Sequence, residues 1–183
     1  MDRFEIRIAG FGGQGIVTIG RILGAAFTVL DGYNSVNTQS YGPESRGGAC
    51  RSEVVVSEGE INYPYVRKAD IFVSLSQLSF DTYIKEVKEG GKLLIDPRAV
   101  KLKPGCDLYE VFKIPAMELA YDVGSVKYQN SVTLGALYPL IKNIVKESSL
   151  RQALSENVPE KTKAVNLKAF EKGKEYIQTH YDL

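Results

Sequence analysis

Apolar residues recur along the first part of the chain at two spacings, one typical of strands and one typical of helices. Residues 4–9 alternate apolar and polar positions, which predicts a strand that ends at a glycine. Residues 16–30 carry apolar side chains three and four positions apart, which predicts a helix that Asp31-Gly32 terminates. The same criteria predict, in order, strand 34–39, strand 50–57, strand 70–75, helix 79–88, strand 92–96 and strand 108–113.

The last third of the chain is mostly helical by these criteria. The pattern predicts a short helix over 114–121, a longer helix over 130–145 that Pro139 kinks or divides, and a final helix over 160–180. Strands that alternate with helices favour a mainly parallel sheet with right-handed crossovers. The sequence therefore predicts one α/β domain over residues 1–183, a Rossmann-like three-layer α/β/α fold with an inserted β-hairpin between Cys50 and Tyr63.

Composition and charge narrow the class of protein. The chain is 44% hydrophobic and 25% charged, as soluble globular domains are. Its 23 basic and 22 acidic residues leave a formal charge of +1, which gives no general attraction to nucleic acid or to an anionic membrane. The first residues lack the pattern of a secretory signal. We therefore expect a cytoplasmic protein with no nucleic-acid or membrane partner, which binds any anion locally.

Gly10, Gly12 and Gly15 form a G-x-G-x-x-G motif where the first predicted strand meets the first predicted helix. Such glycines permit a tight turn and a close approach of the backbone to a phosphate, beside the partial positive charge of a helix N-terminus. The second predicted strand, however, lacks the acidic residue that holds a ribose hydroxyl in dinucleotide-binding domains, and Asp31 precedes that strand. The motif supports ligand contact and close packing equally, and a nicotinamide site less than either.

A second glycine-rich loop, residues 41–48, reads Tyr-Gly-Pro-Glu-Ser-Arg-Gly-Gly. Its Gly-Pro pair predicts a turn, and Arg46 followed by two glycines suits a carboxylate or phosphate group. The alternative is a solvated loop in which Glu44 and Arg46 pair with each other. We expect both loops at the carboxyl ends of adjacent strands, where open α/β sheets bind ligands, and therefore in one joint site.

The remaining residues form no catalytic set. His180 is the only histidine and falls in the last predicted helix, which argues against a histidine triad or a histidine metal cluster and predicts a surface position. Cys50 and Cys106 form no C-x-x-C pair, so two reduced, mostly buried cysteines are favoured over a single disulfide. We predict no catalytic residue and no metal ligand in this chain.

Two stretches together resemble a known family. The first is Ile-Ala-Gly-Phe-Gly-Gly-Gln-Gly-Ile at residues 8–16, and the second is Ser-Tyr-Gly-Pro-Glu-Ser-Arg-Gly-Gly at residues 40–48. Their order and spacing are similar to those in the gamma subunits of 2-oxoacid:ferredoxin oxidoreductases, the pyruvate/ketoisovalerate oxidoreductase catalytic domain family. Further similar points are Asn130, Leu134-Gly135-Ala136, Asn166, Ala169 and Gly173. The proline in the second loop resembles the 2-oxoglutarate branch more than the pyruvate branch, and branched-chain and aryl-pyruvate enzymes remain open.

The resemblance implies one subunit of a multi-chain enzyme that oxidatively decarboxylates a 2-oxoacid to an acyl-CoA and passes electrons to ferredoxin. Alpha and beta subunits, with a delta subunit in some complexes, would be partners and would hold thiamine diphosphate, magnesium and the iron–sulfur clusters. This chain, not catalytic alone, would contribute to coenzyme A binding and to active-site closure. The resemblance places that role on Gly12, Gly13, Gln14, Gly15, Tyr41, Glu44, Arg46, Gly47 and Gly48.

Two other interpretations of the glycine motif remain open. The chain could be a free-standing Rossmann-like nucleotide-binding module, in which the motif binds a nucleotide without any partner chain. It could instead be a purely structural subunit, whose glycines only allow elements or subunits to pack closely. The sequence does not define the 2-oxoacid or the subunit stoichiometry.

Overall fold

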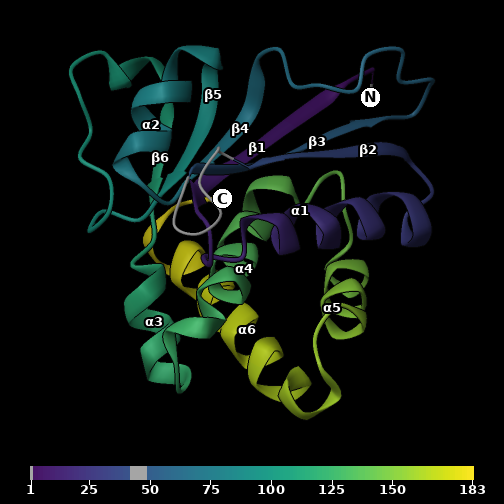
Figure 1. Cartoon of the computed structure of the whole chain (residues 1–183), viewed down its shortest axis with the longest axis vertical. Coiled ribbons are helices and arrows are strands. Elements are labelled where there is room, and N and C mark those ends of the chain that lie inside the picture. The colour runs from purple at the N-terminus through teal and green to yellow at the C-terminus, as the bar shows by residue number, and fades with distance from the viewer. Residues whose placement is uncertain (1, 42–48) are drawn as a thin grey trace.

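The computed structural model describes residues 2–41 and 49–183, and a six-stranded sheet runs through its centre (Figure 1). The strands lie in the order β2-β3-β1-β4-β5-β6 across the sheet. Their bounds are β1 Phe4–Phe11, β2 Asn34–Tyr41, β3 Ala49–Ser57, β4 Ala69–Ser74, β5 Val87–Ile95 and β6 Glu110–Lys113. The six expected strands are therefore present, with ends close to those predicted except at β5, which begins at Val87 instead of Lys92.

Five of the six strands point the same way. β1, β4, β5 and β6 are parallel neighbours, whereas β3 runs antiparallel to both β1 and β2. The predicted mainly parallel sheet is thus confirmed in part, with β3 reversed. The inserted hairpin exists, but β2 and β3 form it, and residues 61–63 form no strand. The predicted partner was wrong because β2 pairs with β3 along its whole length, from Asn34 opposite Ser57 to Tyr41 opposite Cys50, which a three-residue segment could not match.

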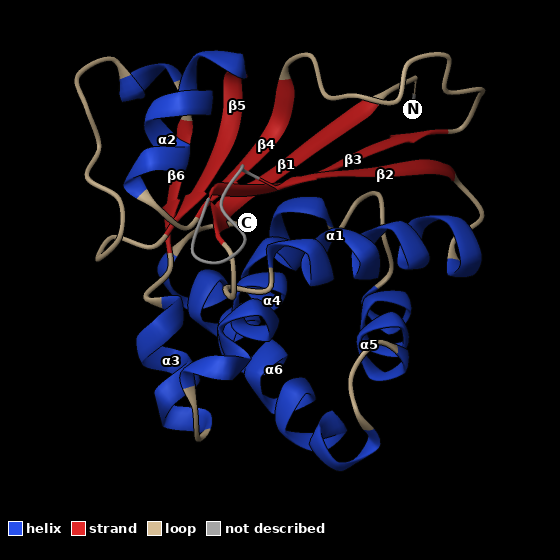
Figure 2. Ribbon diagram, viewed as in Figure 1, coloured by secondary structure: helices blue, strands red, loops and turns tan. Residues whose placement is uncertain are grey.

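Helices cover the two faces of the sheet unequally (Figure 2). α1, α3, α4, α5 and α6 pack on one face over a large apolar cluster, whereas α2 and the loops after β3 and β5 cover the other. The bounds are α1 Ile16–Ala25, α2 Gln77–Tyr83, α3 Ala116–Val123, α4 Gln129–Ile141, α5 Glu147–Glu156 and α6 Lys163–His180. The three-layer α/β/α prediction is confirmed with layers of unequal size. Each helix in the described part of the chain is too short or too polar to cross a membrane.

Several predicted helix boundaries change in the structure. α1 continues into a π-helical turn, η1 (Ala26–Leu30), and Pro139 lies inside α4 without dividing it. The predicted helix 79–88 is wrong at its end, because α2 stops at Tyr83, a 3-10 turn η2 covers Ile84–Glu86, and β5 already begins at Val87. β5 accommodates its two glycines because Gly90 adopts a positive φ of 71° and the pairing with β4 shifts register there.

α5 lies in a segment for which the apolar pattern predicts no helix. Its first turn is capped from a distant part of the chain: the Asp31 carboxylate accepts hydrogen bonds from Lys146 N at 2.8 Å and from Ser149 Oγ at 2.7 Å. A carboxylate at a helix N-terminus satisfies free amides and favours the helix dipole. Asp31 therefore both follows the first helix, as expected, and starts another one. The shorter 3-10 turns are η3 Cys106–Leu108, η4 Val126–Tyr128 and η5 Glu160–Thr162.

Candidate functional site

The glycine turn, residues 11–15, lies at the carboxyl end of β1 and leads into α1. Gln14 N donates to Phe11 O at 3.2 Å, which closes a β-turn with two glycines at its centre. Gly13 has a φ of 96° and Gly15 a φ of 76°, conformations that strain any residue with a Cβ. Gly12 and Gly13 are exposed. The turn therefore presents bare backbone to solvent at the edge where parallel sheets bind ligands.

The start of α1 is open to an anion. Gly15 occupies the N-cap position, no described side chain accepts a hydrogen bond there, and the first turn contains no acidic residue. A helix leaves its first amides without intrahelical partners, and its dipole places a partial positive charge at that end. These amides lie directly after the exposed glycines. The two features together form an uncapped donor site.

Asn130, in the first turn of α4, covers one side of the glycine turn. A Cβ built on Gly15 would lie 2.6 Å from Asn130 Cβ, so this position requires glycine for space as well as for its backbone angle. Asn130 Oδ1 is buried and has no hydrogen-bond partner among the described residues. An unpaired buried acceptor costs about 1–3 kcal/mol. A donor from a ligand or a neighbouring chain would remove that cost.

The side chain of Gln14 is engaged inside the protein. Its Oε1 accepts from Phe11 N at 2.6 Å, and its Nε2 donates to Leu75 O at 3.0 Å. Of the predicted site residues, Gln14 therefore contributes its side chain to the turn itself, whereas Gly12, Gly13 and Gly15 contribute only backbone.

The second loop begins and ends at the same edge of the sheet as the glycine turn. Ala49, which follows the loop, pairs with Phe11, and Cys50 pairs with both Gly10 and Tyr41. Tyr41, the one predicted residue of this loop that the structure describes, is 64% exposed. The predicted site residues outside the described part of the chain are Glu44, Arg46, Gly47 and Gly48. Both loop ends thus lie at the carboxyl edge, but the two motifs are not on adjacent strands as predicted, because β3 returns between β1 and β2.

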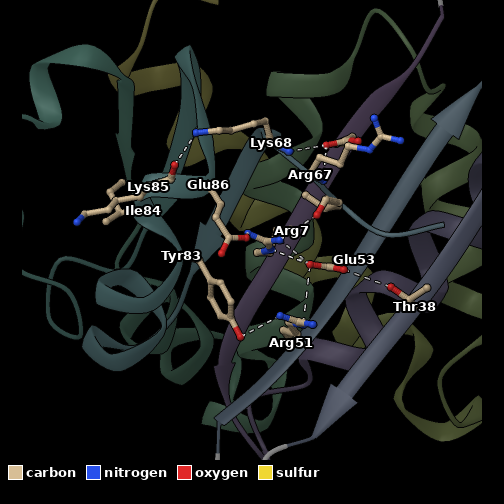
Figure 3. A network of polar contacts seen from close by, with 12 residues as sticks. Arg7, Thr38, Arg51, Glu53, Arg67, Lys68, Tyr83, Ile84, Lys85 and Glu86 are labelled. Carbon is tan, nitrogen blue, oxygen red and sulfur yellow. Dashed lines mark hydrogen bonds and ion pairs between the residues drawn. The ribbon is translucent and has the colours of Figure 1, made fainter. Parts of the chain in front are cut away.

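Arg51, which follows the second loop on β3, contacts a polar network on the face of the sheet that α2 covers (Figure 3). Its guanidinium donates to the Tyr83 hydroxyl at 3.3 Å and lies 3.9 Å from a Glu53 carboxylate oxygen. Burial lowers the pKa of Arg51, but the hydrogen bond to Tyr83 and the charges of Glu53 and Glu86 outweigh it and raise the pKa. Arg51 is therefore a charged member of this network.

Arg7 is at the centre of the same network (Figure 3). Its Nε donates to Glu53 at 2.8 Å, its Nη1 donates to Glu86 at 2.5 Å, and its guanidinium lies 4.7 Å from the centre of the Tyr83 ring. Arg7 and Glu53 face each other in the β1–β3 register, and each is 2% exposed. Such a buried ion pair is a structural element, and the alternation of residues 4–9 gave no sign that Arg7 would be covered.

The cysteines and the histidine behave largely as expected. Cys50 and Cys106 are free, and they pack against the apolar clusters on opposite faces of the sheet. Burial raises the pKa of the Cys50 thiol. His180 is exposed and stacks on Tyr176 with ring centres 4.0 Å apart. Across residues 2–41 and 49–183, no three His, Cys, Asp or Glu side chains group closely enough to hold a metal ion.

The α/β architecture and the glycine turn at the end of β1 can now be compared with known proteins. The family model for pyruvate ferredoxin/flavodoxin oxidoreductase matches residues 5–176, and the chain belongs to this family. Within it, the chain is 46% identical to the 2-oxoglutarate synthase subunit KorC of Methanocaldococcus jannaschii over 176 residues, which cover 94% of this chain and 93% of that relative.

Two solved structures have the same fold over nearly all of this chain. The gamma subunit of the keto/oxoacid ferredoxin oxidoreductase from Geobacter sulfurreducens matches with a TM-score of 0.84 and 38% identity, covering 96% of this chain and 99% of that one. The 2-oxoglutarate:ferredoxin oxidoreductase from Magnetococcus marinus, with 2-oxoglutarate, coenzyme A and succinyl-CoA bound, matches with a TM-score of 0.88 and 26% identity, covering 100% of this chain and 32% of that longer one. The resemblance to gamma subunits of 2-oxoacid:ferredoxin oxidoreductases is confirmed, and the chain is an oxidoreductase subunit of this family.

Proposed function

We propose that this chain is the gamma subunit of a cytoplasmic 2-oxoglutarate:ferredoxin oxidoreductase. The complex would convert 2-oxoglutarate and coenzyme A to succinyl-CoA and carbon dioxide and pass two electrons to ferredoxin. The identity to a 2-oxoglutarate synthase subunit along almost the whole chain supports this substrate. Alpha and beta subunits, with or without a delta subunit, would supply thiamine diphosphate, magnesium and the iron–sulfur clusters.

The contribution of this chain would be to bind coenzyme A at the glycine turn. The observation that carries this proposal is the exposed Gly12-Gly13 backbone followed directly by the uncapped start of α1. Coenzyme A carries phosphate groups, and a helix N-terminus with free amides is a ready anion site. The structural relative with coenzyme A bound supports the ligand class, since its matching part has the same fold.

The second loop would form the other wall of the coenzyme A site. One end of the loop leads into Ala49, which pairs with Phe11, and the other end begins at the exposed Tyr41. We assign to Arg46 a charge-assisted contact with a phosphate, because a guanidinium matches phosphate geometry with two hydrogen bonds. Glu44, Gly47 and Gly48 complete the proposed loop contact.

The strand order disfavours a free-standing dinucleotide-binding module. Such a module needs an acidic residue at the carboxyl end of the parallel strand next to β1, where it holds a ribose hydroxyl. In this chain the neighbour of β1 on that side is the reversed strand β3, and Ala49 lies opposite Phe11. A purely structural role would require a partner subunit that packs on the exposed Gly12-Gly13 backbone, because glycines that only let elements of this chain pack closely are buried.

The test compares two glycines with similar backbone angles in the oxidoreductase reconstituted from this chain and its partner subunits. Gly13 and Gly105 are both exposed, have φ of 96° and 91°, and would accept a Cβ without any atom within 4 Å. Alanine strains each backbone by about 1–2 kcal/mol. We expect Gly13→Ala to raise the KM for coenzyme A about tenfold, the effect of one weakened charge-assisted contact. Gly105→Ala should leave it unchanged.

The KM for 2-oxoglutarate serves as the internal reference in the same assays. It should stay at the wild-type value in both variants, because the proposed contact involves coenzyme A alone. If Gly13→Ala and Gly105→Ala give the same KM for coenzyme A, the glycine turn does not bind this co-substrate.

A further inference from the structure

The amide of Gln14 joins three separate parts of the chain. Its oxygen holds the amide of Phe11 at the end of β1, and its nitrogen holds the carbonyl of Leu75 after β4, at 2.6 and 3.0 Å. The backbone of Gln14 itself closes the glycine turn onto Phe11 O. Each of the two polar groups of the side chain therefore makes a hydrogen bond to protein backbone, which fixes the direction of the amide.

Gly10 makes room for this side chain. A Cβ built on Gly10 would lie 2.3 Å from Gln14 Oε1, closer than real contacts allow. The first glycine of the motif thus does not serve the turn through its own conformation, because only Gly13 and Gly15 in this stretch have positive φ. The spacing of Gly10 and Gln14 is explained by the amide that lies over the glycine.

The region that anchors Gln14 is itself held rigidly. Leu75 N donates to Ala9 O at 2.9 Å, and Ser79 Oγ donates to the same carbonyl at 3.2 Å. Ser79 is buried and lies 2.8 Å from the Ser74 hydroxyl and 3.0 Å from the Ser76 hydroxyl. A group with several satisfied, buried hydrogen bonds has few alternative positions. Gln14 therefore connects the glycine turn to a fixed point at the end of β4.

We propose that Gln14 is a positioning residue, which sets the orientation of the exposed Gly12-Gly13 backbone without touching the ligand. The proposal rests on the proposed function, since it concerns how this turn presents its amides to coenzyme A. Loss of the Gln14 amide would leave the turn free to adopt other conformations. If the turn adopts its ligand-binding conformation only part of the time, the observed affinity for the ligand falls in proportion to that fraction.

The test replaces Gln14 by methionine, which keeps the length of the side chain and removes both hydrogen bonds. Gln77 provides the matched control, because its Oε1 accepts from Lys101 N at 2.8 Å and its Nε2 donates to Asp81 at 3.0 Å, on the exposed side of α2. We expect Gln14→Met to raise the KM for coenzyme A about three- to tenfold, with kcat unchanged, since uniform binding is lost. Gln77→Met should leave both constants at wild type.

Hydrogen exchange gives a second measurement that does not depend on coenzyme A. In Gln14→Met the amide of Phe11 loses its acceptor and should exchange about tenfold faster. Gln14→Glu keeps a carboxylate oxygen for Phe11 N and loses the donor to Leu75 O, so this variant should keep the protection of Phe11 while raising the KM. If Gln14→Met does not assemble with its partner subunits, the KM for coenzyme A is measured in Gln14→Glu instead.

The outcomes separate this inference from the proposed function. If Gln14→Met changes neither the Phe11 exchange rate nor the KM for coenzyme A, whereas Gly13→Ala raises the KM, the positioning role is wrong and the coenzyme A site stands. If Phe11 exchange rises but neither variant changes the KM, Gln14 orders the turn and coenzyme A binds elsewhere. A wild-type exchange rate in Gln14→Met overturns the inference in either case.

Discussion

The two faces of the sheet bury different kinds of side chain. The face under α1, α3, α4, α5 and α6 is lined by apolar residues, such as Ile6 and Ile8 of β1. The face under α2 holds a smaller apolar cluster together with Glu5, Arg7 and Glu53, which are 3%, 2% and 2% exposed. Both faces exclude water, but the buried charged side chains of β1 and β3 lie on the α2 face.

This difference shows that the alternation of a strand distinguishes its faces without defining which of them meets solvent. β1 alternates isoleucines with charged residues, a pattern often read as one buried and one wet face. The charged residues are nevertheless covered, because Arg7 meets Glu53 and Glu86, and Glu5 accepts from the amides of residues 67 and 68 at 3.0 and 2.9 Å. Hydrogen bonds and ion pairs with other elements offset the free-energy cost of burying these charged groups.

The largest expected effect comes from breaking the charged face. Arg7→Met leaves the Glu53 carboxylate buried without its main partner, and loss of one partner of a buried ion pair costs about 3–5 kcal/mol. We expect the free energy of unfolding of the purified chain to fall by that amount in urea denaturation. Arg98→Met is the control, because Arg98 pairs with Glu118 on the surface, where such pairs contribute about 0–1 kcal/mol.

A double variant tests the cause of this loss. Arg7→Met combined with Glu53→Met removes both buried charges, and replacing a whole buried pair by apolar groups is often close to neutral. We expect the double variant to recover most of the stability that Arg7→Met loses. Equal losses in Arg7→Met and Arg98→Met would contradict the importance of the buried charges.

The elements that the sequence predicts well are those whose apolar pattern is local and regular. β1, α1, β4 and α6 carry their signal within their own residues, and the structure places them close to the predicted bounds. α5 does not, because its start depends on Asp31, which lies 115 residues from Lys146. The partner of β3 is likewise a long-range choice, since β2 competes with the segment after the turn at residues 58–60.

As with the fold, the sequence predicted the parts of the candidate site whose signal is local and missed those that depend on distant residues. The glycine pattern located the turn and its strand-to-helix junction, because backbone angles of this kind require glycine at fixed positions. The direction of the Gln14 amide was not predictable, since its acceptor, the Leu75 carbonyl, follows another strand, β4. Asn130 carried a family resemblance, but its contact with Gly15 needs the placement of α4 against α1.

The second expected effect concerns the helical face, where two helices touch through glycine. A Cβ on Gly173 of α6 would lie 1.9 Å from Val132 O, and one on Gly135 of α4 would lie 1.9 Å from Phe170 O. Alanine at Gly173 must push backbone against backbone, and overpacking of this kind costs about 1–3 kcal/mol. We expect Gly173→Ala to lower the urea midpoint by a corresponding amount at constant slope.

Gly24 of α1 is the matched control for this prediction. It is also a helical glycine, but a Cβ there would meet only Asn37 Cβ at 3.6 Å and Ser35 Oγ at 3.8 Å, which are ordinary contacts. Gly24→Ala should therefore stabilise the chain by about 0.5–1 kcal/mol, the helix preference of alanine over glycine. If both variants shift the midpoint in the same direction, the close contact of α4 and α6 is not a constraint on the fold.

The smallest expected effect compares a cysteine from each face. Cys50 is 6% exposed within the apolar cluster of the helical face, and Cys106 is partly buried on the other face. Burial raises the pKa of the Cys50 thiol, and the thiolate is the reactive form. In the folded chain, iodoacetamide followed by mass spectrometry should therefore label Cys106 first. Preferential labelling of Cys50 would show that the apolar cluster on the helical face does not shield this thiol from solvent.

The same pKa shift predicts a small dependence of stability on pH. Because burial raises the pKa of Cys50 in the folded state, that state holds the thiol proton more tightly than the unfolded chain does. The free energy of unfolding should then decrease as pH rises above about 8.5, the pKa of an unperturbed thiol. Cys50→Ala should show a shallower decrease than wild type in urea titrations at pH 8 to 10. Identical slopes for the two chains would mean that the Cys50 thiol ionises as readily in the helical core as in water.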